Sequence, residues 1–469
     1  MIIKEIPSTW IQREGLRLDV GPYKTGAIEA KYKLESLTVT KDSVVEVTLN
    51  GIKGIIHAGR LKRVWVNDPN HGYPFLTTTN IHISSLEKIS YIASSIVAGK
   101  RNLLVKKDWI LITRSGTIGR LAFCRPDMDD FACTEDVMRV VADESKIDAG
   151  YLYAFLSSTF GVQQIIAGTY GAIIQHIEPE HVKDIPVPRF SKELETIIGK
   201  KIKSSAQKRA DANSLMVNAG KQINEHYSFP DKLALSHRIF THSAASSSFV
   251  QKRMDATYHD QIAQLSDELI EKAGADNSLA ELGIQALEGN RMKQIFTGED
   301  YGVPFFTSGE IFRADVTPER FLLRKSLKGG EVWQTREEDL LIARSGQVGG
   351  IIGTGVWADS RFDGACVSPH VLKLRVTNQE VDAGYLYAFM CCTDVGYRQL
   401  IRGAAGSSVP FLSVGDILAI KLPRMNKADE ARIGDMVRQA GRLAAEAQQL
   451  EKEAVKMVED AIEAAAPKH

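Results

Sequence analysis

The C-terminal part of the chain carries apolar residues that recur with the seven-residue period of a coiled coil. One heptad position is filled by Ile433, Ala440, Ala447, Ala454 and Ala461. The other heptad position is filled by Met436, Leu443, Leu450 and Met457. This pattern predicts a long helix that packs on a partner helix, and alanine at one position lets that partner approach closely.

A second segment with helical spacing lies near the middle of the chain, from Ser191 to about His226. It contains no proline, and small or apolar residues recur near helical spacing. Lys201, Ser205 and Asn213 lie near its apolar stripe, so this segment is less regular than the C-terminal one. The sequence therefore predicts a second long helix but leaves its register against the first one open.

Most of the chain is a duplication. The octapeptide DAGYLYAF occurs at residues 148–155 and again at 382–389. Further blocks follow in the same order at an offset of about 230 residues, among them GYPFLTTTNI (72–81) with GVPFFTSGEI (302–311). Blocks repeated in one order over this distance predict two equivalent domains, and the period is far too long for a solenoid.

Within each copy the pattern is mixed. The runs ILITRSG and LLIARSG are rich in residues that favour β-strands and end at Ser-Gly, which predicts a strand followed by a tight loop. In DAGYLYAF the aspartate suits a helix N-cap, and Tyr151, Leu152 and Phe155 share one helical face, which predicts a core helix. The expected fold is α+β, with domains at residues 1–190 and 229–425, each followed by a long helix, at 191–228 and 426–469. Because the helices follow equivalent domains, we predict that they pair antiparallel.

Composition excludes several classes of protein. The 58 basic and 58 acidic residues cancel, so only local charge can indicate a polyanionic partner. No apolar run approaches the roughly 20 residues that span a bilayer, and the N-terminus does not resemble a signal peptide, so we expect a cytoplasmic protein without a membrane partner. The five cysteines lack the spacing of metal ligands or of a disulfide framework, so no metal site is predicted.

The sequence offers no reaction. Phosphate-loop, GxGxxG, GxSxG and HExxH motifs are all missing. The acidic pairs Asp129-Asp130 and Glu337-Glu338 are typical of solvated loops. We therefore predict no catalytic residue. An enzyme with an unrecognised active site between the domains remains an alternative, as does a coiled-coil adaptor without a nucleic-acid role.

The order of the motifs resembles a known family. The Arg-Leu-Asp and Arg-Met-Asp starts, the Arg-Ser-Gly loops, the Gly-Tyr-Leu-Tyr helices and the proline-bearing exits before the long helices are similar to type I restriction-modification specificity subunits. The resemblance runs from about Ile11 to the C-terminal helix. It implies two target recognition domains separated by two long antiparallel coiled-coil helices.

The resemblance also implies a function and partners. Each domain would read one half of a bipartite, asymmetric site in double-stranded DNA. The helices would dock two DNA adenine methyltransferase subunits, which bring S-adenosylmethionine, while this chain holds no cofactor. Restriction subunits that use ATP and Mg are left open. So is the alternative of a specificity module from a related bipartite modification or phage-defence system.

The strand-borne loops supply the first predicted DNA contacts. Their arginines stand just before Ser-Gly, where a hydroxyl and backbone amides can also meet a phosphate. The predicted contacts are Arg114, Ser115, Gly116, Arg120, Arg344, Ser345, Gly346 and Gln347. In the alternative interpretation, Arg114 and Arg344 brace their own loops through carboxylates or carbonyls.

Basic runs and divergent loop tips supply the remaining predictions. The basic residues are Arg60, Lys62, Arg63, Arg291 and Lys293, with a solvated surface as the alternative. Matched tips that differ between the halves suit base reading, because Asn and Gln pair with adenine, Glu accepts from cytosine and Thr contacts the thymine methyl. These tips are Thr77, Thr78, Thr79, Asn80, Gln175, His176, Thr307, Ser308, Glu310, Ser407 and Ser408.

Overall fold

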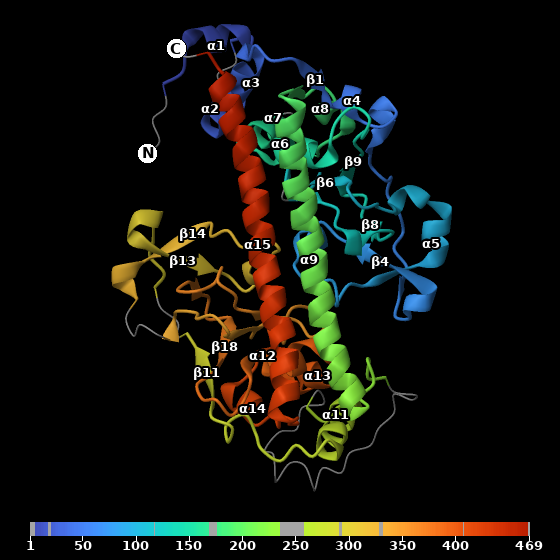
Figure 1. The fold of residues 1–469 in the computed structure, drawn as a ribbon, viewed down its shortest axis with the longest axis vertical. Helices are drawn as coiled ribbons and strands as arrows, with labels where there is room; N and C mark the ends of the chain where they lie inside the picture. The colour runs from blue at the N-terminus through green and yellow to red at the C-terminus, as the bar shows by residue number, and fades with distance from the viewer. Residues whose placement is uncertain are drawn as a thin grey trace. The chain divides into compact units, whose positions relative to one another are not determined.

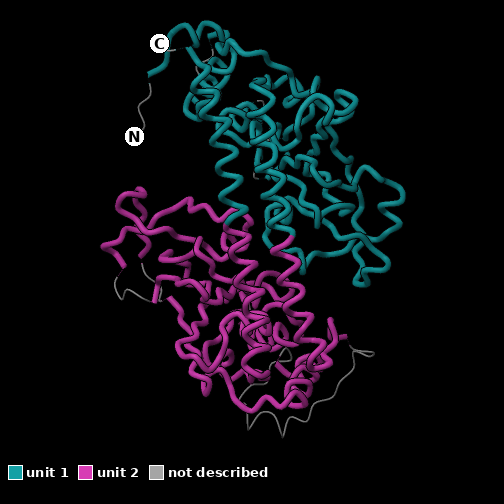
Figure 2. The backbone as a smooth tube through the Cα atoms, viewed as in Figure 1, with its two compact units in different colours: residues 1–210, 446–469 teal, residues 211–445 magenta. Residues whose placement is uncertain are grey.

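The computed structural model describes residues 5–16, 20–116, 118–167, 176–234, 258–289, 293–327, 332–406 and 408–467. The chain forms two compact units, which Figure 2 distinguishes by colour. Unit 1 comprises residues 1–210 and 446–469, and unit 2 comprises residues 211–445. Each unit thus takes one half of each long helix, while the four-segment division made from the sequence stays a prediction. Among the described residues, no helix is both long enough and apolar enough to cross a membrane.

Unit 1 contains short strands and mostly short helices, several of which are labelled in Figure 1. Its helices are α1 (Ser8–Arg13), α2 (Val20–Thr25), α3 (Ala27–Ser36), α4 (Val44–Val47), α5 (Ser94–Gly99), α6 (Ala149–Ser157), α7 (Thr159–Ala167), α8 (Pro179–Val182) and the first half of α9 (Lys192–Tyr227). Its strands are β1 (Lys41–Ser43), β2 (Ile55–Ile56), β3 (Trp65–Val66), β4 (Gly72–Leu76), β5 (Tyr91–Ala93), β6 (Ile110–Thr113), β7 (Leu121–Phe123), β8 (Ala132–Cys133), β9 (Val137–Val140) and β10 (Pro186–Pro188).

Unit 2 repeats much of this sequence of elements. Its helices are the second half of α9, α11 (Gln261–Lys272), α12 (Ala383–Cys392), α13 (Asp394–Arg402), α14 (Val414–Leu418) and the first half of α15 (Lys427–Ala465). Its strands are β11 (Ile284–Glu288), β12 (Phe296–Thr297), β13 (Gly302–Phe306), β14 (Arg320–Leu323), β15 (Leu340–Ala343), β16 (Gly355–Trp357), β17 (Cys366–Val367) and β18 (Val371–Val376).

The sheets confirm the duplication strand by strand. Unit 1 has sheets in the orders β2-β9-β6-β7 and β3-β5-β4-β8, and unit 2 has the matching orders β11-β18-β15-β16 and β12-β14-β13-β17. Register is preserved as well, since Ile110 pairs with Val140 and the equivalent Leu340 pairs with Leu374. In both units one pairing, β4 with β8 and β13 with β17, is parallel. The predicted α+β fold of two equivalent copies is therefore confirmed.

The repeated octapeptide forms the predicted core helix in both copies. Asp148 caps α6 by accepting hydrogen bonds from the amides of Gly150 and Tyr151, and Asp382 caps α12 by accepting from the amide of Tyr385. Tyr151, Leu152 and Phe155 are fully buried. The hydroxyl of Tyr151 donates to the carbonyl of Pro188, and Tyr385 does the same at Pro423. This bond ties the core helix to the proline-bearing exit, so its repetition reflects a shared scaffold.

The long helices pair antiparallel within each unit. In unit 1 Lys201 pairs with Glu453 and the later Lys208 with the earlier Glu446, each at 2.7 Å. In unit 2 the amide of Gln222 contacts the sulfur of Met436. The helices end close to the predicted bounds, α9 at Lys192 and Tyr227 and α15 at Lys427 and Ala465.

The predicted seam of α15 is only partly correct. The alanine position is buried at Ala440, Ala447 and Ala454, whereas the second position, including Leu443 and Leu450, is half-buried. The reason is that α15 also packs against its own globular unit, where Gly434 lies beside Gly384 and Gly441 beside Trp357. As a result, the buried positions of α15 differ from those of a helix that packs on one partner helix alone.

Replacing Gly384 by alanine should therefore destabilise unit 2. A Cβ at Gly384 would lie 2.6 Å from both the Cα and the carbonyl oxygen of Gly434. Such overpacking typically costs about 1–3 kcal/mol of the free energy of unfolding, measured by urea denaturation. Gly415→Ala in α14 is the matched control, because its Cβ would meet no atom within 4 Å. Equal stability of the two variants would show that the contact between the helices is not tight.

Candidate nucleic-acid interface

Backbone hydrogen bonds bring four segments of unit 1 together. The amide of Thr134 donates to the carbonyl of Leu76 at the end of β4, at 2.9 Å. The amide of Arg114 donates to Asp136 at 3.0 Å, and the amide of Ile177 donates to Arg114 at 3.1 Å. The end of β4, the turn between β8 and β9, the loop after β6 and the segment before α8 thus converge at one place.

Unit 2 repeats this convergence bond by bond. The amide of Ser368 donates to Phe306 at 2.9 Å, and the amide of Arg344 donates to His370 at 2.8 Å. The amide of Leu412 donates to Arg344 at 2.9 Å. The backbone arrangement is therefore constant between the units, whereas several side chains that it presents differ.

A buried cation occupies the same strand position in each unit, and in unit 1 it fixes the turn before that strand. Arg139 in β9 is fully buried and donates to the carbonyls of Val137 and Cys133, both at 2.7 Å. Its counterpart in β18 is Lys373, which is also buried and donates to the carbonyl of Val332. Burial lowers the pKa of Lys373 to about 8. Paired with carbonyls in this way, Arg139 acts as a scaffold for the turn that it closes.

Arg114 and Arg344 make the contacts expected if they brace their own loops. Nε of Arg114 donates to the carbonyl of Ile177 at 3.0 Å, and the guanidinium pairs with Glu178. Nε of Arg344 donates to Leu412 at 3.0 Å, and its Nη2 lies 2.7 Å from Glu288. The two side chains are only 13% and 22% exposed. Their geometry favours bracing, and contact with a phosphate stays a prediction.

Arg344→Ala should therefore reduce stability as well as binding. We expect a loss of about 1–3 kcal/mol in the free energy of unfolding, because Glu288 and the Leu412 carbonyl lose a charged partner. Gln347→Ala is the control, since Gln347 is exposed in the same loop and should change stability by less than about 0.5 kcal/mol. A binding defect in Arg344→Ala with an unchanged thermal midpoint would instead indicate a DNA contact without bracing.

In the predicted loop tips after β4 and β13, side-chain oxygens accept hydrogen bonds from backbone amides of the same turn. The amide of Thr77 donates to Oδ1 of Asn80 at 3.2 Å, and the amide of Thr307 donates to Glu310 at 2.7 Å. Burial alone would raise the pKa of Glu310, but hydrogen bonds from Thr307 and the charge of Arg320 hold it below its ordinary value. Glu310 is therefore a charged, nearly buried turn-closing group, and its role as a base reader stays a prediction.

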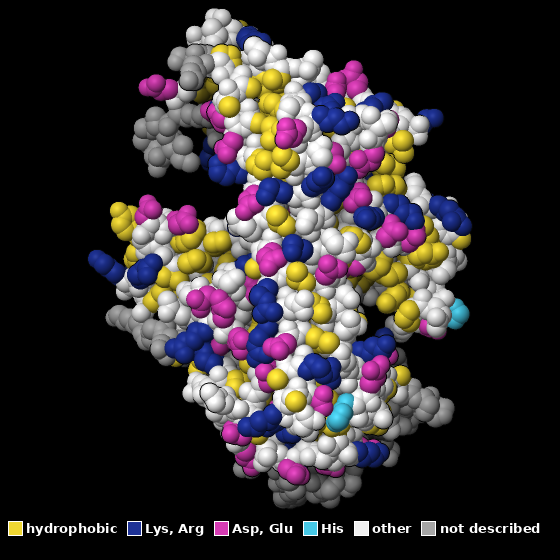
Figure 3. Space-filling model, viewed as in Figure 1, with side chains coloured by type: hydrophobic (Ala, Val, Ile, Leu, Met, Phe, Trp, Pro, Cys, Tyr) yellow, Lys and Arg dark blue, Asp and Glu magenta, His cyan; other side chains and the backbone are white. Residues whose placement is uncertain are grey.

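The remaining predicted residues differ in exposure. Those with exposed side chains or backbone are Arg60, Lys62, Arg63, Thr79, Gly116, His176, Lys293, Gln347 and Ser408. Those that are half-buried are Thr77, Thr78, Asn80, Ser115, Arg120, Thr307, Ser308, Ser345 and Gly346. Gln175, Arg291 and Ser407 lie outside the described residues. On the face drawn in Figure 3, basic and acidic side chains are interspersed. Because the 58 basic and 58 acidic residues of the chain also balance, affinity for a polyanion must come from local groups.

Sequence reasoning missed the matched turn between β8 and β9. At its tip unit 1 carries Glu135 and Asp136, and unit 2 carries Pro369 and His370. Nδ1 of His370 lies 3.1 Å from Oγ of the predicted contact Ser345. Alignment of the two halves of the sequence could have revealed this turn, because the acidic pair of one half matches Pro-His in the other between two equivalent strands.

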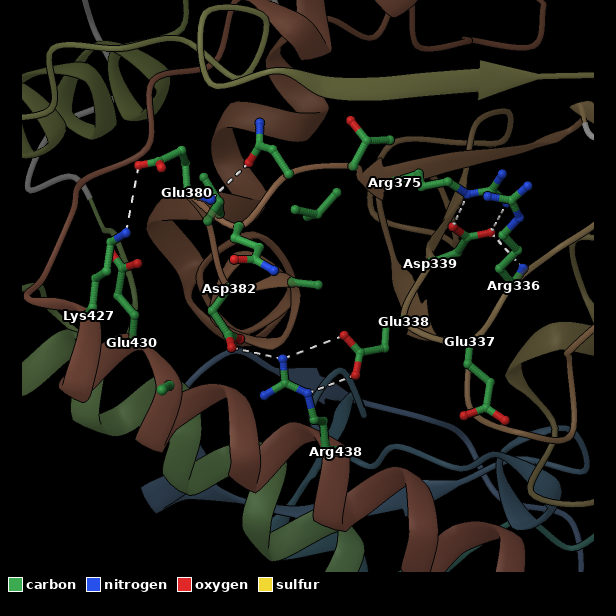
Figure 4. Close-up of a pocket in the computed structure, with 17 residues that line it drawn as sticks. Arg336, Glu337, Glu338, Asp339, Arg375, Glu380, Asp382, Lys427, Glu430 and Arg438 are labelled. Atoms are coloured by element: carbon green, nitrogen blue, oxygen red, sulfur yellow. Dashed lines mark hydrogen bonds and ion pairs between the residues drawn. The ribbon is translucent and has the colours of Figure 1, made fainter.

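A charged cleft of about 670 Å³ lies in unit 2, beside the start of α15 (Figure 4). Its charged groups are largely paired with one another: Arg438 bonds to Glu338 and Asp382, and Arg375 bonds to Asp339. Unit 1 has an equivalent ion pair, in which Lys203 bonds to Asp148 at 3.0 Å. The repetition indicates that the pairs of Arg438 with Asp382 and of Lys203 with Asp148 anchor the long helices to the core helices. Among the described residues, no group of three or more His, Cys, Asp or Glu could hold a metal ion.

Among solved structures, the chain is similar to specificity subunits of type I restriction-modification systems. The S subunit from M. genitalium is 13% identical, with a TM-score of 0.33 over 92% of this chain and 97% of that chain. The HsdS subunit from Thermoanaerobacter tengcongensis is 14% identical, with a TM-score of 0.26 over 91% of this chain and 96% of that chain.

A third similar structure concerns the assembly and conformational transition of the type I R-M system. It is 14% identical, with a TM-score of 0.28 over 91% of this chain and 95% of that chain. No protein-family model and no curated protein matches the chain. At TM-scores this low, the likenesses establish neither the fold nor the function, which rest on the chain's own sequence and geometry.

Proposed function

We propose that this chain is the DNA sequence-specificity subunit of a type I restriction-modification system. One observation carries the proposal: the same convergence of four segments is built twice with matching backbone hydrogen bonds, while the side chains at its tips differ. A constant backbone with different side chains at its loop tips would let the two units recognise two different variants of one kind of ligand. An asymmetric DNA site in two halves is such a ligand, with one unit reading each half.

Affinity in this proposal comes from phosphate contacts. Exposed basic residues in the segments before β3 and β12, such as Arg60, Lys62 and Lys293, are suited to meet phosphates. Gly116 in the loop after β6 is exposed as well, and its backbone N–H would be a further donor. Specificity comes from the tips that differ between the units, including the Glu135-Asp136 and Pro369-His370 pairs.

The chemistry in this proposal belongs to partner subunits. Two DNA adenine methyltransferase subunits would bring S-adenosylmethionine, and a restriction subunit, where present, would use ATP and Mg. The paired helices α9 and α15 are the docking elements, and half-buried Leu443 and Leu450 supply apolar surface there. The chain itself is non-catalytic in this account, as its motifs and their resemblance to specificity subunits imply.

The proposal is tested by site selection from random DNA. The chain, assembled with a type I methyltransferase subunit, should enrich one interrupted sequence with two specific halves and a spacer of fixed length. The chain alone should transfer no methyl group. Binding that is indifferent to DNA sequence would favour a coiled-coil adaptor. Turnover by the chain alone would favour an enzyme with an unrecognised site.

A further inference from the structure

Arg63 of unit 1 is an exposed arginine that its own unit holds in place. Its Nη2 donates to the hydroxyl of Thr134 at 3.1 Å and to Oε2 of Glu135 at 3.3 Å. Its guanidinium carbon lies 5.5 Å from the ring centroid of Phe75 in β4. The side chain is nevertheless 35% exposed. Arg63 therefore combines solvent access with a fixed orientation.

Arg320 of unit 2 is held in the same way. Its Nη2 donates to both carboxylate oxygens of Glu310, each at 3.0 Å. Its guanidinium carbon lies 5.6 Å from the ring centroids of Phe305 and Phe296. The side chain is 39% exposed, whereas that of Glu310 is only 11% exposed. A nearly buried carboxylate thus fixes an arginine that solvent can reach.

The two phenylalanines are equivalent, but the two arginines are not. Phe75 pairs with Ala132 in β8, and Phe305 pairs with Cys366 in β17, at the same register. Arg63 precedes β3, where unit 2 has Gln294, and Arg320 begins β14, where unit 1 has Ser90. The two units therefore place a guanidinium over the same phenylalanine from different segments.

The carboxylates have changed together with the arginines. Where unit 1 has Glu135 and Asp136, unit 2 has Pro369 and His370, and where unit 2 has Glu310, unit 1 has Asn80. Each unit thus keeps one arginine with its own carboxylate and lacks the pair of the other unit. Exposed ion pairs add little to stability, so packing alone does not explain why this arrangement is built twice.

We infer that Arg63 and Arg320 are the guanine-reading residues of the two units, an inference that rests on the proposed function. An arginine that pairs with N7 and O6 of guanine is the commonest specific contact in the major groove. In both arginines the hydrogen bonds to the carboxylate leave from Nη2, and within the described residues neither Nε nor Nη1 has a hydrogen-bond partner. Because each bidentate fork of a guanidinium includes Nη2, the arginine would read guanine with one of these unbonded nitrogens together with Nη2, which would exchange one of its present acceptors for the base.

The carboxylate supplies preorganisation. A guanidinium that is already oriented loses less side-chain freedom when it binds, and its planar fork keeps the geometry that guanine requires. Because Arg63 and Arg320 come from different segments, the guanine that each reads need not occupy the same position within its half-site. Glu135 and Glu310 are positioning residues in this account, since they act through the arginines.

The test is site selection with the assembled complex and single variants. Arg63→Ala should lose about 10- to 100-fold of the preference for guanine at one position, in one half-site only. Arg320→Ala should do the same in the other half-site. Arg63→Lys should also lose the preference, because a lysine keeps the charge without the fork. Glu135→Gln should weaken the preference at the position that Arg63 reads.

Controls separate this inference from its rivals and from the proposed function. Lys62→Ala, at the exposed residue next to Arg63, should weaken binding to all sequences alike. A uniform loss of affinity in Arg63→Ala with an unchanged motif would overturn the inference and leave the function intact. A lowered thermal midpoint with an unchanged motif would do the same. Absence of any enriched motif with the parent complex would overturn both.

Discussion

Raising the salt concentration from 50 to 200 mM should weaken binding of the assembled complex to its DNA by about 10³-fold or more. Affinity for DNA depends on counterions released from phosphates, and about six to ten phosphate contacts give a loss of this size. The chain has a formal net charge of zero, so its own share of the effect must come from local basic groups. Fluorescence anisotropy titrations across this salt range measure it directly.

Single substitutions refine this salt prediction. Removing one phosphate contact, as in Lys62→Ala, should reduce the slope of log affinity against log salt by about one. Lys456→Ala is a matched control, because Lys456 is exposed on α15 and already bonds to Asp460 at 2.8 Å. A flat response of the parent complex to salt would contradict binding through phosphates.

Asp339→Ala should cause the largest loss of stability of any single substitution predicted here. The carboxylate of Asp339 is 1% exposed and accepts from Nε and Nη2 of Arg375, at 2.7 and 2.6 Å. It also accepts from the amide of Arg336 at 2.8 Å. Its removal leaves a guanidinium buried without this counter-charge, which costs about 3–5 kcal/mol of the free energy of unfolding. Urea denaturation followed by circular dichroism measures the loss.

The neighbouring Glu337 supplies the control for this prediction. Glu337 lines the same cleft but is exposed, so Glu337→Ala should change stability by less than about 0.5 kcal/mol. A loss below about 1 kcal/mol in Asp339→Ala would mean that water or another group replaces the carboxylate. In that case the buried pair would not anchor the cleft.

Elements with strong local signals could be predicted from the sequence. The core helices α6 and α12 begin at their capping aspartates, because Asp148 and Asp382 satisfy amides at the helix start. The long helices end within a few residues of the predicted bounds, because an apolar repeat over many turns is a strong signal. The duplication predicted the matching sheets, although their strand orders could not be derived.

Contacts between distant segments could not be predicted. Glu178 and Glu288 brace the two loop arginines from unrelated positions, so no local pattern reveals that Arg114 and Arg344 are engaged. Strands of two to five residues, such as β3 and β13, carry too little alternation to be assigned. Arg320 was missed because its neighbours Phe305 and Glu310 become informative only when the sheet brings them together.

The central claim is that the two units read two half-sites independently. The most direct measurement replaces residues 11–189 by the same segment of another specificity subunit and selects sites from random DNA with the assembled complex. The account predicts that one half of the enriched sequence changes, while the other half is the same as that of the parent chain. Simultaneous change of both halves, or an unchanged sequence, would contradict it.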